Sequence, residues 1–144
     1  MFNFEAMVQA FGDGVIACDV AGTIVFWNAA ATRIFGFSAE EATGQSLDLI
    51  IPQRQQQRHW DGYHKTLATG ATRYGSDVLR VPAVHKEGKP LSIAFTVALL
   101  HAPDGSMAGI AAVVRDDTVR WGEERALKAR VRELEVGAVG QVDV

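Results

Sequence analysis

The hydrophobic positions of this chain change their period along its length, and the period predicts where strands and helices lie. Five segments are rich in β-branched and aromatic residues, as strands are. They cover residues 15–19, 23–27, 74–84, 90–101 and 107–114. Apolar residues alternate within the last two, so their apolar side chains share one sheet face. Short turns rich in Gly, Asp and Lys separate the last three segments.

Two further segments have the spacing of helices. Residues 2–11 place Phe4 and Met7 on one side, and Gly12 begins the turn that ends the segment. Residues 53–69 contain no Pro and only one Gly, which predicts a longer helix ending at Gly70. The sequence therefore predicts an α+β domain with an amphipathic helix ahead of the first strand.

The segment 25–44, VFWNAAATRIFGFSAEEATG, couples a strand to two short helical turns. Asn28 has a side-chain oxygen able to cap the first turn, and Gly36 can end it. Ser38 with Glu41 three residues later is a capping box that opens the second turn. The alanines between Asn28 and Gly36 allow this region to pack closely on the sheet.

This segment, within the order β-β-α-α-α-β-β-β, resembles the PAS domain family over about residues 10–118. The resemblance implies a five-stranded antiparallel sheet with helices on one face, and a ligand or cofactor between sheet and helices. It also implies a cap helix over residues 1–11, the PAS domain over 12–118 and an output helix over 119–135. Residues 136–144 have no period and are expected to form a flexible tail.

The junction after the last predicted strand supports the output helix. Residues 115–118 read Arg-Asp-Asp-Thr, which resembles the Asp-x-Thr signature that joins many PAS domains to such a helix. Beyond it, Trp121, Leu127, Val131 and Leu134 form a narrow apolar stripe typical of a coiled-coil seam or docking helix. We expect a homodimer; the alternative is a helix packed on its own domain.

One histidine is a candidate metal ligand. At 100° per residue, His59 shares a helix face with Tyr63 and Leu67, whereas His64 points elsewhere. Imidazole is a good axial ligand for haem iron. Among PAS domains the chain most resembles the haem-binding domains of FixL-type and Dos-type oxygen sensors, and counting without gaps from the turn glycines Gly70 and Gly88 places their ligand position on His59. The resemblance thus implies haem b with His59 as its metal ligand.

The same resemblance implies the rest of the pocket. Lys65 and Arg73 match the residues that hold the haem propionates, and strand residues match the distal wall. The candidate cofactor-binding residues are His59, Tyr63, Lys65, Leu67, Arg73, Tyr74, Leu79, Ile93, Phe95, Val97, Ile110 and Ala112.

One position departs from those sensors. They have an arginine where this chain has Leu79, and strand alternation turns the neighbouring Arg80 to the other sheet face. The distal side is therefore expected to be apolar, with a weaker hydrogen bond to oxygen and better tolerance of CO or NO.

Other readings remain open. His59 could instead be a core histidine bonded to a backbone carbonyl, in a cofactor-free interaction module that dimerises through residues 2–11 and 121–134. A small carboxylic or aromatic metabolite could bind through Arg73 or Arg80, and flavin could bind without a covalent bond. A flavin-cysteine adduct is not expected, because the matching stretch Gly-Gln-Ser-Leu-Asp after residue 43 lacks cysteine.

Composition narrows the function classes. The chain has 144 residues, of which 48% are hydrophobic, and this is enough to form one hydrophobic core. Its net charge of −3 and the lack of a basic run give no basic patch for binding nucleic acid. The apolar runs are too short to span a bilayer, and the N-terminus lacks a basic signal-peptide region. Cys18 is the only cysteine, which excludes an internal disulfide. We expect a cytoplasmic sensor and no enzyme, since the sequence contains no pattern of a catalytic carboxylate pair and no phosphate-binding loop.

Overall fold

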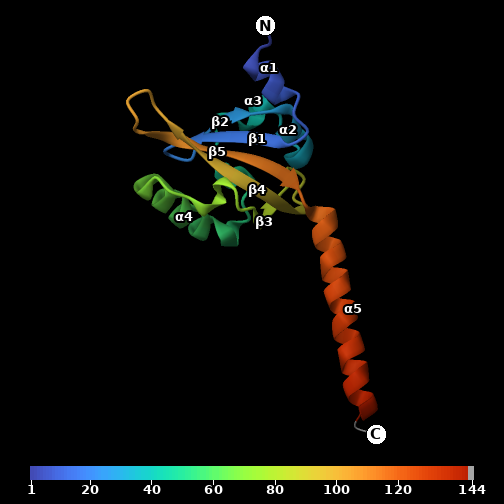
Figure 1. The fold of residues 1–144 in the computed structure, drawn as a ribbon. Helices are drawn as coiled ribbons and strands as arrows, with labels where there is room; N and C mark the ends of the chain where they lie inside the picture. Colours follow the sequence, from blue (N-terminus) through green and yellow to red (C-terminus); the bar gives the residue numbers. More distant parts are fainter. Residues whose placement is uncertain (143–144) are drawn as a thin grey trace.

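The computed structural model describes residues 1–142 and contains one five-stranded antiparallel sheet (Figure 1). Its strand order is β2-β1-β5-β4-β3, so the two halves of the chain meet where β1 pairs with β5. The strands are β1 (Gly14–Asp19), β2 (Ile24–Trp27), β3 (Leu79–Val84), β4 (Pro90–His101) and β5 (Met107–Asp116).

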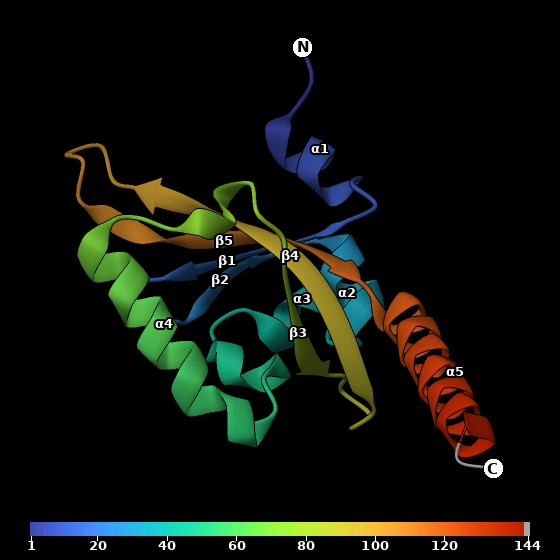
Figure 2. The ribbon, with the colours of Figure 1, turned by 60° about the horizontal axis from the view of Figure 1, so that its bottom comes forward.

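The helices are distributed unequally around the sheet. They are α1 (Phe4–Gln9), α2 (Ala29–Phe35), α3 (Ala39–Ala42), α4 (Gln56–Thr69) and α5 (Thr118–Val142). Figure 2 shows α3 and α4 below the sheet, α1 above it and α5 leaving the domain. The predicted α+β fold and its five antiparallel strands are confirmed, with α2, α3 and α4 on one face.

The best-packed part of the core lies between β1, β2 and α2. Trp27 and Phe35 are almost completely buried, and their rings lie 5.5 Å apart. The predicted caps explain why the chain turns here: Asn28 Oδ1 accepts from the Ala31 N–H at 3.0 Å, and Gly36 ends α2 with φ of 84°. A side chain at Gly36 would also collide with His85, whose ring lies over it.

Three boundaries differ from the sequence prediction by more than about two residues, whereas the ends of α1 and β5 differ by no more than that. The strand expected from residue 74 begins at Leu79, because Thr72 caps a 3₁₀ turn over Arg73–Gly75. The helix expected from residue 53 begins with a 3₁₀ turn and becomes α-helical at Gln56. The last helix continues past residue 135 to Val142, into the expected tail; residues 143–144 lie outside the described part.

Strand pairing settles which side chains face the helices. Leu79 pairs with Phe95, and Phe95 pairs with Val114, so these three share the inner face. Arg80 pairs with Ala94 and lies on the outer face, as its neighbour Leu79 is inward. The predicted orientation of Arg80 is therefore confirmed.

Candidate functional site

Helix α4 carries the candidate histidine and stands at one side of the sheet (Figure 2). The helix ends at Gly70, which adopts φ of 66° and donates its backbone N–H to the Thr66 carbonyl. His59, Tyr63 and Leu67 lie on its inward face, yet only Tyr63 is buried. The helix thus meets the core through a few aromatic side chains.

His59 has an unpaired nitrogen inside the protein. Its ring is half-buried, 4.5 Å from the Trp60 ring and 5.8 Å from the Tyr63 ring. Among the described residues, its Nδ1 is the one buried side-chain nitrogen or oxygen without a hydrogen-bond partner. Burial lowers the pKa of His59 below its usual value, an effect that the charge of Asp48 opposes. The imidazole is therefore neutral near pH 7 and keeps a lone pair for a ligand.

Two aromatic side chains attach α4 to the turn between β1 and β2. The Tyr63 hydroxyl donates to the Asp19 carbonyl, and the Trp60 Nε1–H donates to Asp48 Oδ1 at 2.7 Å. The Trp60 indole also covers Gly22, where an added Cβ would lie 2.1 Å from its ring. These contacts hold the two rings that lie beside His59.

Apolar side chains form the wall that α4 faces. Ile93 and Ile110 are buried in the same cluster as Tyr63, and most of its neighbours are half-buried. The candidate residues that the structure brings into this cluster are Tyr63, Leu67, Ile93, Phe95, Val97, Ile110 and Ala112. The wall combines α4 with strands β4 and β5, far apart in sequence.

Besides His59, four candidate residues lie outside that cluster. Lys65 and Arg73 are exposed. Arg73 donates to the Tyr74 hydroxyl at 2.8 Å and lies over the Tyr74 ring, which occupies the 3₁₀ turn rather than a strand. Leu79 is half-buried at the start of β3.

The remaining groups with possible chemistry lie elsewhere. His64 is exposed on α4, and His85 is half-buried and packs on Gly36. Cys18 is a buried core residue, and burial raises its pKa to about 12. Among the described residues, no three His, Cys, Asp or Glu side chains form a metal-binding group, and none of the helices could cross a membrane.

Sequence reasoning missed two features of the site. Asp48 orients Trp60 and places a carboxylate near His59, although it lies before α4 in a 3₁₀ turn. No local pattern signals that contact. Leu99 joins the apolar wall, and it could have been found by extending the alternation of Phe95 and Val97 by two residues.

The residues fit a haem group by their donor chemistry. A neutral imidazole with an unpartnered buried nitrogen lies beside Trp60 and Tyr63, which belong to or pack on the apolar cluster, and such surroundings suit a flat, largely apolar macrocycle. Cations at positions 65 and 73 are solvent-accessible at the end of α4, where propionates need them. The Trp60 and Tyr63 rings lie beside His59, so entry of such a group requires these rings to move.

Comparison with known proteins places this geometry in a family. A model of the PAS fold matches residues 3–116. An uncharacterized protein of Azorhizobium caulinodans is 35% identical over 125 residues, 86% of this chain and 17% of that protein. Sensor protein FixL of Bradyrhizobium diazoefficiens is 25% identical over 92% of this chain and 25% of its own length. Oxygen sensor protein DosP of Escherichia coli is 25% identical over 90% of this chain and 15% of its own.

Solved structures show the same fold. The PAS domain of a Colwellia psychrerythraea protein has a TM-score of 0.70 at 19% identity, covering 80% of this chain and 94% of that one. An RNA-binding light-oxygen-voltage receptor has a TM-score of 0.72 at 15% identity, and the match covers 90% of this chain and 36% of that receptor chain. The chain spans a quarter or less of the curated relatives it matches. From the family match and this shared architecture, the chain belongs to the PAS fold family.

Proposed function

We propose that this PAS domain is a sensor that binds haem b through His59 and responds to a diatomic gas or to redox state. The observation that carries the proposal is the buried, unpartnered Nδ1 of His59 beside an apolar cluster. The similarity to proteins named FixL and DosP supports it. The proposal includes a cytoplasmic location, and assigns no reaction to the chain.

Each residue has a defined role in this proposal. A bound haem supplies an iron that takes O2, CO or NO, or changes oxidation state. The neutral His59 ring provides the ligand nitrogen, and Phe95, Val97 and Ile110 exclude water from the apolar face. Lys65 and Arg73 bind the propionates, for which Arg73 leaves the Tyr74 hydroxyl.

The hydrogen bonds that hold Trp60 and Tyr63 beside His59 are weak enough for a bound ligand to displace them. Two hydrogen bonds, from Tyr63 to Asp19 and from Trp60 to Asp48, hold the rings in place. Each contributes about 0.5–1.5 kcal/mol, or somewhat more for the charged Asp48. A tightly bound ligand exceeds this cost easily, since a micromolar dissociation constant corresponds to about 8 kcal/mol.

A change in the pocket has a direct route to α5. Leu79 faces the inner side of β3, and the next residue, Arg80, reaches Asp117 on the outer side at 3.7 Å. Asp117 begins the link to α5: its N–H donates to the Ser92 carbonyl at 2.7 Å, and its carboxylate accepts two hydrogen bonds from Arg120. A shift of β3 thereby moves the base of the helix.

The decisive experiment is an absorption spectrum of protein expressed with ample haem. We expect a Soret band that is lost or displaced in His59→Ala and retained in His64→Ala, the matched control on the exposed side of α4. A band unaffected by His59→Ala contradicts the assigned ligand. Absence of a band from every protein, including refolded protein titrated with hemin, contradicts haem binding itself.

The distal wall offers a second test of the same proposal. Leu79 leaves the pocket without a strong donor at this position, so the loaded protein should favour CO over O2 more than an arginine-containing pocket does. Leu79→Arg should lengthen oxygen retention and lower the CO preference, whereas Arg80→Ala should leave both unchanged. If the two variants have equal effects on gas binding, Leu79 does not line the pocket.

The second candidate function is a cofactor-free interaction module. It is favoured by the Trp60 and Tyr63 side chains, whose rings lie beside His59 and are held by hydrogen bonds to Asp48 and to the Asp19 carbonyl. In that case Tyr63→Phe and Trp60→Phe should lower the free energy of unfolding, and neither the variants nor the wild-type protein should take up haem. A haem-bound protein should instead take up hemin faster when either bond is removed.

A further inference from the structure

Asp48 differs from the other carboxylates that are half-buried in this structure. Each of those has stronger or more numerous partners: an ion pair with an arginine for Asp13, Asp117 and Glu124, and two N–H groups of its own turn for Asp19. In the described part of the chain Asp48 has no ion pair, and its side chain accepts one hydrogen bond, from the neutral Trp60 indole at 2.7 Å. A carboxylate has about four acceptor positions, so the protein leaves most of those of Asp48 unused.

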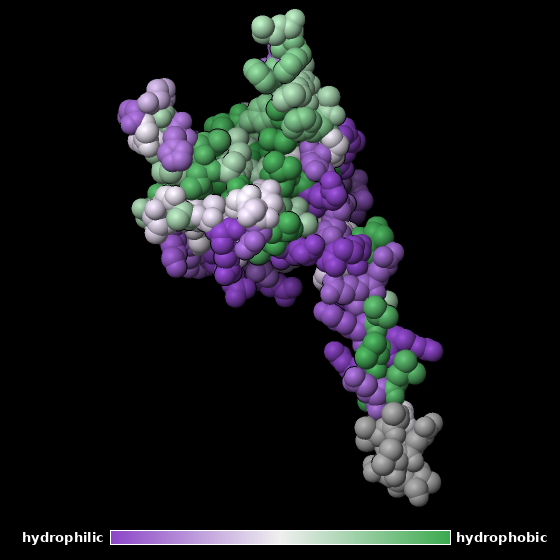
Figure 3. All heavy atoms as spheres, viewed as in Figure 1, coloured by the Kyte–Doolittle hydropathy of each residue, from purple (hydrophilic) through white to green (hydrophobic). Residues whose placement is uncertain are grey.

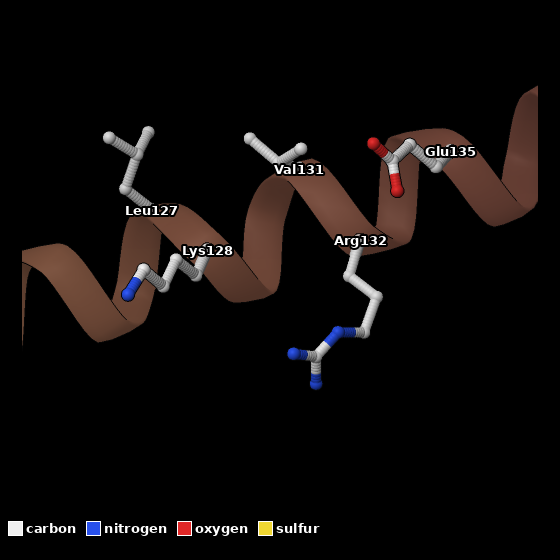
Figure 4. A pocket seen from close by; sticks show the side chains of 5 residues that line it. All are labelled: Leu127, Lys128, Val131, Arg132 and Glu135. Carbon is white, nitrogen blue, oxygen red and sulfur yellow. The ribbon is translucent and has the colours of Figure 1, made fainter.

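The other described carboxylates are exposed to solvent. Figure 3 shows hydrophilic residues gathered on the lower side of the domain and along α5. Figure 4 shows one exposed carboxylate, Glu135, beside a shallow hollow on α5 whose lining residues are all exposed. A solvated carboxylate gains little from a new partner, because water already satisfies it. Asp48 is therefore the carboxylate best placed to take a further hydrogen bond inside the protein.

Trp60 contacts both Asp48 and His59. Its Nε1–H donates to the carboxylate, and its ring centroid lies 4.5 Å from that of the imidazole. Burial lowers the pKa of His59 and the charge of Asp48 opposes this effect, so the carboxylate is close enough to act on the ring. The Nδ1 atom of the same ring is buried without a partner. One indole thus contacts a carboxylate with a single donor and an imidazole with an unpaired nitrogen.

Ligand binding changes the partners of these groups. The inference rests on the proposed function, in which haem b binds beside His59 and the Trp60 ring moves. That movement breaks the bond from Trp60 and leaves the half-buried Asp48 carboxylate without a donor, which costs free energy until it finds another. In a neutral imidazole one nitrogen carries a proton, and when the other nitrogen binds a metal, this N–H needs an acceptor. The carboxylate and the imidazole can satisfy each other.

We propose that Asp48 is a positioning residue that exchanges Trp60 for His59 when haem binds. Its carboxylate then accepts the N–H of the ring nitrogen that does not bind iron. This bond fixes the tautomer and the orientation of the imidazole and makes the ring a stronger electron donor. Asp48 contacts neither the iron nor the gas, and acts through His59. In the haem-free protein the same carboxylate holds the Trp60 ring in place.

The indole N–H of Trp60 tests the exchange directly. Proton–nitrogen correlation spectra compare the haem-free protein with the ferrous, CO-bound protein, which is diamagnetic, and Trp60→Phe identifies the signal. We expect the Trp60 N–H to exchange with solvent about tenfold faster in the loaded protein, since it has lost its acceptor. The Trp27 N–H, bonded to Thr32 and to the Phe37 carbonyl, is the internal control and should keep its rate. A Trp60 rate that is unchanged on loading overturns the exchange.

The properties of the iron test the new partner of Asp48. Asp48→Asn keeps the shape of the side chain and removes its charge. We expect this variant to raise the midpoint potential and to lower the iron–histidine stretching frequency, because the imidazole becomes a weaker donor. Asp61→Asn is the matched control, since Asp61 is exposed on the same helix and bonded to Gln57, and it should change neither value. A stretching frequency that is equal in the wild type and Asp48→Asn overturns the proposal.

The same samples separate this inference from the proposed function. Absence of a Soret band from the wild-type protein contradicts haem binding and the exchange together. A Soret band that depends on His59, combined with an unchanged Trp60 exchange rate or an unchanged iron–histidine frequency, overturns the role of Asp48 alone.

Discussion

The two halves of the inner core are packed very differently. On the β1, β2 and α2 side, Ile24, Ala31 and Phe35 are 0% exposed, and Asn28 is buried with all its polar atoms bonded. Within helix α4 itself only Tyr63 is buried, and His59 retains an unpaired nitrogen. Well-packed regions resist change, whereas regions with few buried contacts open first. The first half is a scaffold, and the second is where a ligand can enter.

The largest expected effect compares two phenylalanines on opposite halves. Phe35→Ala should lower the free energy of unfolding by about 3–5 kcal/mol, because a fully buried ring leaves a cavity. Phe95→Ala should cost only about 1–2 kcal/mol, since a half-buried ring loses part of its transfer free energy. Urea denaturation of both variants measures the difference. Equal losses would show that the α4 side is as well packed as the scaffold.

The next effect compares two helix-capping asparagines. Asn28 Oδ1 accepts from the Val15 and Ala31 N–H groups, and its amide donates to the carbonyls of Val8 and Asp13. Asn28→Ala leaves buried groups unpaired and should cost about 2–4 kcal/mol. Asn3→Ala removes an exposed cap of α1 and should cost less than about 1 kcal/mol. A similar loss of unfolding free energy at both positions would show that the four hydrogen bonds of Asn28 do not stabilise the scaffold more than an exposed cap does.

The hydroxyl group of Tyr63 attaches α4 to the end of β1, and removing it tests how much this contact stabilises α4. Tyr63→Phe removes the hydrogen bond to the Asp19 carbonyl but keeps the ring in the core. The expected cost is about 0.5–1.5 kcal/mol, smaller than for Asn28→Ala, with faster hydrogen exchange confined to α4. A loss of 3 kcal/mol or more, or faster exchange in β1 and β2 as well, would show that α4 belongs to the scaffold.

The smallest effect is the pH dependence of the haem-free protein. Because burial lowers the pKa of His59 in the folded state, the unfolded chain binds a proton first as the pH falls below about 6.5. The contribution of His59 to stability is therefore present at neutral pH and decreases as the pH falls through that window. His59→Gln should reduce the slope of unfolding free energy against pH, and His64→Gln should not. An unchanged slope in His59→Gln would mean that the ring is solvated in the folded protein.

Local sequence signals predicted some parts of the molecule well. The caps at Asn28, Gly36 and Ser38 and the turn at Gly70 were correctly predicted, because each acts within a few residues of itself. The start of β3 was wrong, since the apolar pattern of 74–84 gave no sign that Thr72 would cap a 3₁₀ turn. Capping by a side chain overrode the strand preference there.

The candidate site was only partly predictable. Helical and strand periods indicated that His59, Tyr63 and the alternating residues of β4 face inward. The period could not indicate that Trp60 reaches Asp48 and Gly22, or that Arg73 bonds to Tyr74 instead of facing the pocket. Those contacts depend on where separate elements meet.

The sequence by itself determined the element order, the capping sites and the face on which each apolar residue lies, because periodicity and capping are local properties of the chain. Only the tertiary structure decided that β1 pairs with β5, that Arg80 joins Asp117 at the base of α5, and that His59 keeps a buried nitrogen free. Contacts between distant segments depend on how whole surfaces pack, and no local pattern encodes the partner of a side chain across that distance.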